Sequence, residues 1–165
     1  MDAVTYPTAS VADFLSDRFV CLKLDTSAPT PDFRRILGQE GLRWTPTFVV
    51  TDHALRQLRR IIGFLPPDDF LAELRLVLGV AALARGRNET ALPALRAVAD
   101  LHPRSHVASE ALFWAGIAAF RVAGRDKAAL RDGWEPLWER YPDSTWAQRT
   151  SVWPDQLQSM KPGGQ

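Results

Sequence analysis

The sequence predicts an α/β fold followed by an all-α segment, and three observations lead to this prediction. Two short runs rich in β-branched residues, 47–51 and 58–62, flank a polar segment, which is typical of a β-hairpin. Stretches with apolar residues at helical spacing lie before and after this hairpin. From residue 88 onward the strand pattern stops, and a short motif recurs 39 residues later within helical sequence.

The N-terminal part predicts a helix followed by a strand. A helix is expected over residues 9–17, because Val11, Phe14 and Leu15 recur at helical spacing. A strand is expected over residues 19–25, where apolar residues occupy both faces. Such a strand belongs inside a sheet, with layers covering it on each side.

Two further helices flank the hairpin. One is predicted over residues 31–40, since Thr30 suits an N-cap position and Pro31 the first helical position. The other is predicted over residues 67–79, where acidic residues in the first turn favour a helix N-terminus. The apolar run 76–84 is too short to span a bilayer and predicts a buried helix.

The C-terminal half contains an internal repeat. Residues 102–108 read HPRSHVA and residues 141–147 read YPDSTWA, so Pro, Ser and Ala recur at an offset of 39. Each copy follows an amphipathic helix, which indicates stacked helix pairs in which Pro ends one helix and Ser caps the next. We therefore predict a helical repeat segment over residues 80–153, followed by a disordered tail over residues 154–165.

Composition excludes several classes of function. A net charge of +1 with 46% apolar residues lacks the basic excess of a nucleic-acid-binding module. The single cysteine, Cys21, rules out an internal disulfide and a zinc site built on several thiolates. We expect no cofactor, no nucleic-acid partner and no membrane partner. The N-terminus has no signal-peptide pattern, so the chain as written is expected in the cytoplasm.

Residues 19–25 (FVCLKLD), 44–50 (WTPTFVV) and 62–64 together resemble the thioredoxin family of thiol–disulfide oxidoreductases, in forms that carry a C-terminal TPR-like extension. The resemblance implies an incomplete thioredoxin-like fold over residues 1–79. It also implies that the Thr45–Pro46 peptide bond is cis. Trp44, Thr45 and Pro46 would then lie along an edge that binds polypeptide, so the expected partner is a protein or polypeptide.

The sequence departs from this family at its N-terminus, because the first strand and its Cys-x-x-Cys motif are missing. Residues 1–6 resemble the stretch just after the second cysteine of that motif. The chain as given is therefore expected to be redox-inactive, with no catalytic residue, and to represent a truncated gene model. Its full-length form would exchange disulfides with polypeptides, and it would be periplasmic if a signal peptide were lost with the missing part.

The missing strand would lie centrally, between the counterparts of residues 19–25 and 47–51. Its loss leaves two outcomes open: these two strands pair directly, or their edges stay open and prone to association. We expect poor solubility for the isolated chain.

Three other groups of residues could belong to a redox, metal or ligand site, but a structural role is the preferred interpretation of each. Cys21 lies within an apolar run, where a buried, unreactive thiol is expected rather than a redox centre. His102, His106 and Glu110 have metal-ligand spacing, but Pro103 interrupts the helical face, so a helix end is the preferred interpretation. Core packing is expected for the tryptophans of the repeat, which are Trp114, Trp134, Trp138 and Trp146.

A second hypothesis from a different class of function remains open. The chain would then be a non-enzymatic adaptor whose helices, over residues 88–153, bind a partner protein. The 39-residue repeat motivates this alternative.

Overall fold

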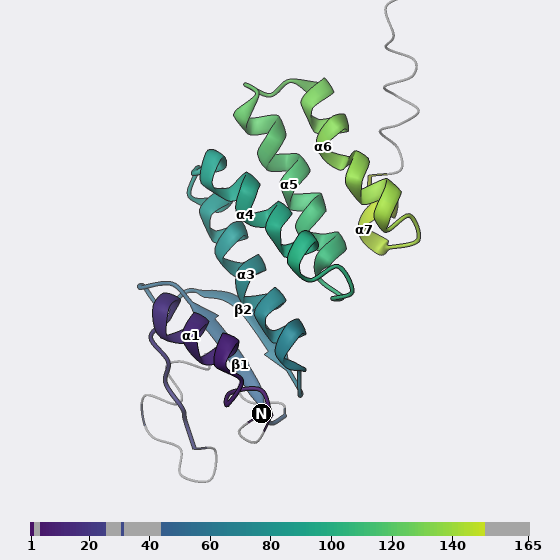
Figure 1. Ribbon diagram of the computed structural model, residues 1–165. Coiled ribbons are helices and arrows are strands. Elements are labelled where there is room, and N and C mark those ends of the chain that lie inside the picture. Colours follow the sequence, from purple (N-terminus) through teal and green to yellow (C-terminus); the bar gives the residue numbers. More distant parts are fainter. Residues whose placement is uncertain (2–3, 26–30, 32–43, 151–165) are drawn as a thin grey trace, which may run out of the picture. The chain divides into compact units, whose positions relative to one another are not determined.

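The computed structural model describes residues 1, 4–25, 31 and 44–150 (Figure 1). The described part has mixed content, being mostly helical with one two-stranded antiparallel sheet. It divides into two compact units, Met1–Leu71 and Ala72–Gln165, and each is described by itself below. The predicted helix 31–40, apart from residue 31, and the predicted disordered tail 154–165 lie outside the described residues.

The first unit begins with helix α1, Ala9–Arg18, which confirms the predicted helix. Thr8 precedes it in an extended conformation and makes no side-chain cap, and the helix ends where Phe19 turns to extended backbone. Val11 is its one fully buried residue. A short helix with so little buried surface depends on its surroundings for stability, since isolated helices of this length are marginal.

The two predicted hairpin strands are confirmed. Strand β1, Thr47–Thr51, pairs antiparallel with β2, Gln57–Ile62. In the register Thr47 lies opposite Ile62, and an irregularity between Val50 and Thr51 shifts the pairing at the turn end. Asp52 organises that turn through its carboxylate, as described below.

The strand predicted over residues 19–25 is wrong. These residues form no helix or strand; Val20 is fully exposed and Leu22 is 65% exposed, whereas Phe19 and Leu24 are half-buried. A strand needs a neighbouring strand to bond with its N–H and C=O groups, and the sheet of the described residues contains only β1 and β2. Residues 19–25 and β1 therefore do not pair directly, which removes the first of the two outcomes left open by the sequence.

Helix α3, Pro67–Ala84, continues five residues beyond the predicted end at residue 79. Pro67 occupies its first position, and Asp68 and Asp69 lie in its first turn, where carboxylates interact favourably with the helix dipole. The division between the two units falls within this helix. Its second half supplies Leu76 and Leu83 to the core of the second unit.

The predicted repeat is confirmed as two helices that are related by the same offset of 39. Helix α4, Asn88–Leu101, and helix α6, Lys127–Arg140, have equal lengths and begin 39 residues apart. Helix α5, Ala108–Val122, follows the first, and the short helix α7, Thr145–Gln148, follows the second.

The turns after α4 and α6 share their backbone hydrogen bonds. The N–H of His102 donates to the Val98 carbonyl, as that of Tyr141 does to the Leu137 carbonyl, at 2.9 and 3.0 Å. The N–H of Ser105 donates to the carbonyl of His102, and the equivalent bond joins Ser144 to Tyr141. The repeat in sequence is thus a repeat in backbone geometry.

The core of the second unit joins successive helices in chain order. One cluster of buried residues combines α3, α4 and α5, and a second combines the ends of α4 and α5 with α6 and α7. Trp134 is buried, and the other three tryptophans of the repeat are half-buried against these clusters, as predicted. No helix among the described residues has the length and apolarity needed to cross a membrane.

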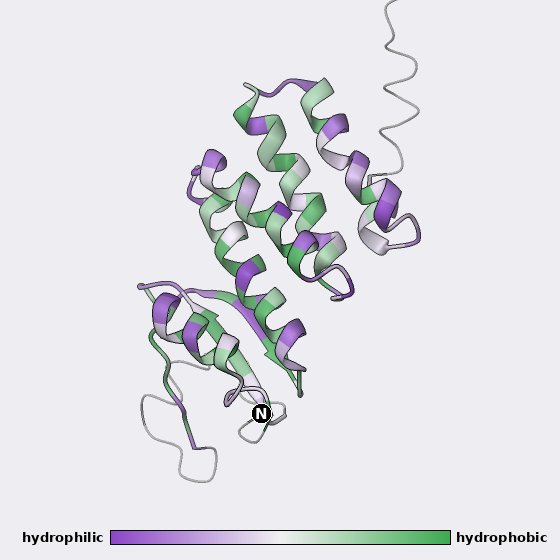
Figure 2. Cartoon of the chain, viewed as in Figure 1, coloured by the Kyte–Doolittle hydropathy of each residue, from purple (hydrophilic) through white to green (hydrophobic). Residues whose placement is uncertain are grey.

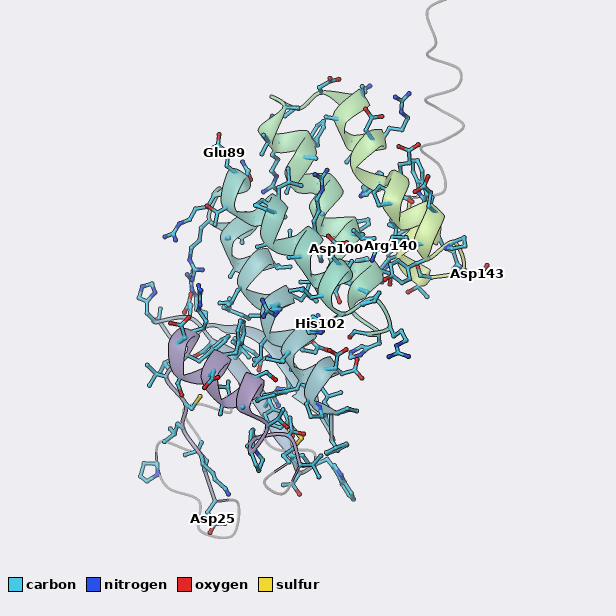
Figure 3. The ribbon with its side chains drawn as sticks, viewed as in Figure 1. Asp25, Glu89, Asp100, His102, Arg140 and Asp143 are labelled. Carbon is cyan, nitrogen blue, oxygen red and sulfur yellow. The ribbon has the colours of Figure 1, made fainter. Side chains whose placement is uncertain are left out.

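A polar contact fastens the end of α6 to the end of α4. Arg140 forms an ion pair with Asp100 at 2.8 Å and donates a second hydrogen bond to the carbonyl oxygen of Ala99 (Figure 3). The hydroxyl of Tyr141 donates to the carbonyl oxygen of Pro103 at 2.7 Å. A guanidinium is well placed at a helix C-terminus, where the carbonyl groups lack intrahelical partners.

Candidate functional site

The predicted polypeptide-binding residues lie just before and at the start of β1. Trp44 is 69% exposed, Thr45 is exposed and Pro46 is half-buried. The peptide bond between Thr45 and Pro46 is cis, as the resemblance implied. These three residues therefore form an accessible segment that leads directly into the strand.

Two hydrogen bonds fix this segment on the sheet. The carbonyl oxygen of Pro46 accepts from the N–H of Gly63 at 2.8 Å, which extends the β1–β2 ladder by one pair. The hydroxyl of Thr47 donates to the carbonyl oxygen of Trp44 and closes a tight bend. Gly63 has a φ of 98°, a conformation that glycine adopts without steric cost.

The bond between Gly63 and Pro46 also determines which backbone groups of β1 face outward. In an antiparallel ladder, hydrogen-bonded pairs alternate with pairs whose N–H and C=O groups point away. Since Pro46 belongs to a hydrogen-bonded pair, residues 48 and 50 bond to β2, whereas Thr47, Val49 and Thr51 point to the other side. We call the backbone groups of these three residues the outer edge of β1.

The outer edge of β1 has no partner strand among the described residues. Strand β1 is moreover free of charged side chains, as the hydropathy colours show, whereas β2 carries Arg59 and Arg60 (Figure 2). Natural proteins usually protect such edges with charges, proline or bulges. Between Val50 and Thr51 the register skips Leu58, so the irregularity of this hairpin lies on β2.

One face of the hairpin is packed, and this packing holds β1 in place. Phe48 contacts Phe70 with ring centroids 4.9 Å apart, and Tyr6 lies edge-on to both rings. The Thr5 hydroxyl donates to the carbonyl oxygen of Leu65 at 2.8 Å, so the N-terminal turn is tied to the chain after β2. The edge of the hairpin is therefore presented by a supported strand.

Asp52 fixes the turn at the far end of the hairpin. Its carboxylate accepts from the N–H groups of Ala54 and Arg56 at 2.9 and 3.0 Å, and from Nε of Arg56 at 2.8 Å. The side-chain hydrogen bond from Arg56 is the main reason why the pKa of Asp52 falls from 3.8 to about 2. Desolvation by burial opposes this shift, and the two backbone N–H groups add to it.

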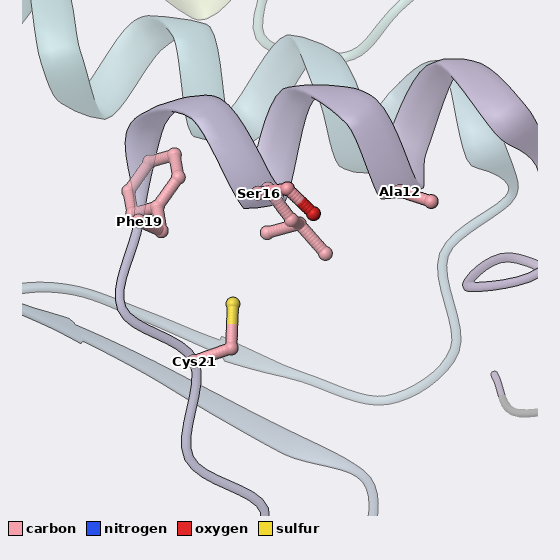
Figure 4. A pocket seen from close by; sticks show the side chains of 5 residues that line it. Ala12, Ser16, Phe19 and Cys21 are labelled. Atoms are coloured by element: carbon pink, nitrogen blue, oxygen red, sulfur yellow. The ribbon is translucent and has the colours of Figure 1, made fainter.

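Cys21 is exposed, which corrects the prediction of a buried thiol. The prediction failed together with the strand that was expected to bury it. The side chain points toward Ser16 of α1 across an open hollow of about 520 Å³, which Ala12, Leu15 and Phe19 also line (Figure 4).

The histidine motif of the repeat does not form a metal site in the described part of the chain. No three His, Cys, Asp or Glu side chains gather there as metal ligands would. Nε2 of His106 instead lies 2.9 Å from Oε1 of Glu73, a buried carboxylate on α3. Glu110 accepts a long hydrogen bond from the indole of Trp114. The first contact joins the turn before α5 to α3, and the second lies within α5.

Comparisons of this chain with known protein families, with curated proteins and with solved structures found no match. The outer edge of β1 and the adjoining Trp44 are therefore interpreted from their own geometry. The sequence resemblance predicts a binding role for Trp44, Thr45 and Pro46 but not for Val49 and Thr51. Only the hairpin register reveals that those two residues face outward.

Proposed function

We propose that this protein is a redox-inactive, thioredoxin-like protein that binds extended polypeptide along Trp44, Thr45, Pro46 and the outer edge of β1. The observation that carries the proposal is a strand edge to which no strand of the described residues is bonded, with a 69% exposed tryptophan just before its start. The thioredoxin-like fold belongs to the proposal too, supported by the sequence resemblance of residues 44–50.

An extended polypeptide fits the chemistry of this edge. Outward N–H and C=O groups can form main-chain hydrogen bonds with a strand of almost any sequence, which is the basis of binding by strand addition. Trp44 offers a large, rigid apolar surface next to those groups. The absence of charged side chains on β1 favours neutral, β-branched segments over acidic or basic ones.

The redox-inactive part of the proposal follows from the single cysteine. Thiol–disulfide exchange proceeds through a mixed disulfide that a second thiol must resolve, and this chain supplies only Cys21. Oxidoreductase activity would therefore belong to a form of the protein that carries a Cys-x-x-Cys pair. We expect the chain as given to bind polypeptide without reducing it.

Binding to a permanently unfolded polypeptide tests the proposal. Reduced, carboxymethylated α-lactalbumin, labelled with a fluorophore, provides a probe with no free thiol, and fluorescence anisotropy reports its binding to the full chain. Trp44→Ala should weaken binding by roughly tenfold, the effect of removing a central aromatic contact. Leu101→Ala removes a large, 57% exposed apolar residue from α4 and is the matched control. Equal affinities for the two variants would contradict the proposal.

The second candidate function is a TPR-like adaptor in which α4 to α7 bind a partner protein. The observation that favours it is the recurrence of the same backbone bonds after α4 and α6, because stacked helix pairs present extended binding surfaces. A photo-crosslinker placed at the exposed Arg131 of α6 would test it against the same group at Ser16 of α1. A reproducible partner captured only from Arg131 supports the adaptor, and identical capture from both positions counts against it.

A further inference from the structure

The turns α3–α4 and α5–α6 of the second unit share one backbone arrangement. Residues 86–88 read GRN, and residues 124–126 read GRD. The N–H groups of Arg87 and Arg125 each donate to the carbonyl oxygen five residues earlier, at 3.0 and 2.7 Å. The glycine before each arginine has a positive φ, 74° in the first turn and 65° in the second. Each turn therefore presents an arginine directly after its glycine.

Both turns lie at the same end of the second unit. The guanidinium of Arg121, at the end of α5, donates to the carbonyl oxygen of Leu83, near the end of α3, at 3.1 Å. Figure 1 shows the turns α4–α5 and α6–α7 at the opposite end of these helices, and Figure 2 shows hydrophilic residues in both GR turns. Exposed basic residues gather at the GR turns, and we call these side chains the basic end: Arg85, Arg87, Arg121, Arg125 and Lys127.

Three cations of the basic end have no partner within the described part of the chain. Arg87, Arg125 and Lys127 form no ion pair and no side-chain hydrogen bond there. Arg140, near the other end of the unit, is by contrast paired with Asp100. An arginine without a partner keeps all of its N–H donors available for an anionic ligand.

The carboxylates close to these cations in sequence have other roles. Asp126 caps α6, since its side chain accepts from the N–H of Ala128. Asp132 forms an ion pair with Arg131, and Glu89 lies in the first turn of α4, where the helix dipole favours a carboxylate. The basic end therefore carries a local excess of positive charge on a chain whose net charge is only +1.

We propose that the basic end binds an acidic segment of a polypeptide partner. The inference rests on the second candidate function, the TPR-like adaptor, and names the chemistry of its partner. A guanidinium binds a carboxylate through two parallel hydrogen bonds, and the positive potential of this end steers acidic segments toward it. A flexible peptide can place its carboxylates beside separate guanidiniums. Glu89 and Asp126 would instead repel the closely spaced phosphates of a nucleic acid.

Fluorescence anisotropy of a labelled oligoglutamate peptide tests the inference on the full chain. The unchanged protein should bind this peptide at low ionic strength, and the affinity should fall as salt screens the charges. Arg87→Glu/Arg125→Glu should weaken binding by roughly tenfold or more, because two attractions become two repulsions. The same variant should bind oligolysine more tightly than the unchanged protein does.

The matched control is Arg96→Glu/Arg104→Glu. Both of these arginines are exposed and lie outside the basic end, Arg96 within α4 and Arg104 in the turn after it. The control changes the net charge by the same amount as Arg87→Glu/Arg125→Glu, so it should keep most of the affinity for oligoglutamate. An equal loss in both variants would show that net charge, and not the basic end, determines binding.

A further variant guards against loss of folding. Arg125 has a φ of 71°, a conformation that glycine adopts more readily, so Arg125→Gly should be at least as stable as the unchanged protein. It should still weaken oligoglutamate binding by about two- to fivefold, the effect of removing one exposed ion pair. A stable Arg125→Gly variant with unchanged affinity would contradict the inference.

The outcomes separate this inference from the proposed functions. Trp44→Ala should leave oligoglutamate binding unchanged, because Trp44 belongs to the first unit. A chain that does not bind oligoglutamate at low ionic strength overturns the inference. Equally tight binding of oligothymidylate also overturns it, since the surface would then be a general anion site. A partner captured from Arg131 by a chain that does not bind oligoglutamate leaves the adaptor in place with a different docking surface.

Discussion

Trp134 of α6 lies directly against the backbone of Gly116 in α5. A methyl group at Gly116 would fall 2.2 Å from Cδ1 and 2.4 Å from Nε1 of the indole. The indole Nε1 also donates a hydrogen bond of 2.9 Å to the carbonyl oxygen of Phe113, so the ring cannot move aside without losing this bond. Gly133 faces the same crossing, where a methyl group would lie 2.8 Å from Cα of Gly116. The two helices can approach this closely only because small residues occupy the crossing.

Gly116→Ala is therefore expected to lower the free energy of unfolding by about 1–3 kcal/mol, the usual cost of overpacking a core. Urea denaturation of the full chain, followed by circular dichroism, measures the change. In the double variant with Trp134→Leu, the alanine meets a smaller side chain. The double variant should therefore lose less free energy of unfolding than the two single variants lose together. Strict additivity would show that the clash with Trp134 is not the cause.

Arg125 is expected to lower stability at the turn between α5 and α6. It has a φ of 71°, directly after Gly124, which has a φ of 65°. A side chain in this left-handed region crowds its own backbone, so Arg125→Gly should raise the free energy of unfolding by about 0.5–1 kcal/mol. The same replacement at Arg131, inside α6, should lower it by about 1 kcal/mol. Thermal denaturation of both variants would refute the explanation if their effects had the same sign.

The two serines of the repeat should respond differently to removal. The Ser144 side chain accepts from the N–H of Ala147 and caps α7, whereas α5 has no side-chain cap. The hydroxyl of Ser105, at the equivalent position, is buried and has no hydrogen-bond partner among the residues that the structure describes. Ser144→Ala should cost about 1 kcal/mol of stability. Ser105→Ala should cost nothing or stabilise the protein, because it removes a buried polar group. Chemical denaturation of the pair would contradict this if Ser105→Ala proved the more damaging.

The turn of the hairpin should lose stability in acid. The pKa of Asp52 is lowered from 3.8 to about 2 in the folded chain, so its contribution is complete above pH 4 and is lost as the pH falls through about 2. Asp52→Asn should therefore destabilise the hairpin at neutral pH, and the difference from the unchanged protein should shrink toward pH 2. Carboxyl NMR titration measures this pKa directly. If Asp52 titrated near pH 3.8, the hydrogen bond from Arg56 would not lower its pKa, and this explanation would be wrong.

The elements that the sequence predicted well are those encoded by local signals. The strand over residues 47–51 is bounded by a proline and a polar turn, and the structure has the same limits. The 39-residue repeat was recognisable from Pro, Ser and Ala alone, and its turns proved to share backbone bonds. The capping role predicted for the serines is confirmed at Ser144 but wrong at Ser105, because α5 begins three residues later, at Ala108.

The failures concern residues whose state depends on distant partners. The apolar pattern of residues 19–25 indicates a strand, but a strand forms only where another backbone supplies hydrogen bonds. Residues 19–25 are not part of the sheet that the described residues form, and the prediction of a buried Cys21 failed as well. The outward orientation of Val49 was equally inaccessible, since it follows from the bond between Pro46 and Gly63. The alternation of apolar residues in the sequence predicts which face of the sheet each side chain lies on. Only the hydrogen-bonding register shows toward which neighbouring strand the N–H and C=O groups of a residue point.

The hydrogen bonds between the ends of α6 and α4 bear on how 39-residue units could be added to the repeat segment. Arg140 and Tyr141 bond to Asp100, Ala99 and Pro103, so the end of α6, the first helix of the second pair, is held to the end of α4, the first helix of the first pair. The joint is made of neighbours alone, which is the property of a modular array. A contact of this kind involves only two adjacent units and does not depend on the number of units before them. A second copy of the 39-residue unit that carries Arg140 and Tyr141 would bring this attachment with it, whereas a copy of the first unit would not, because Leu101 stands at the position of Arg140.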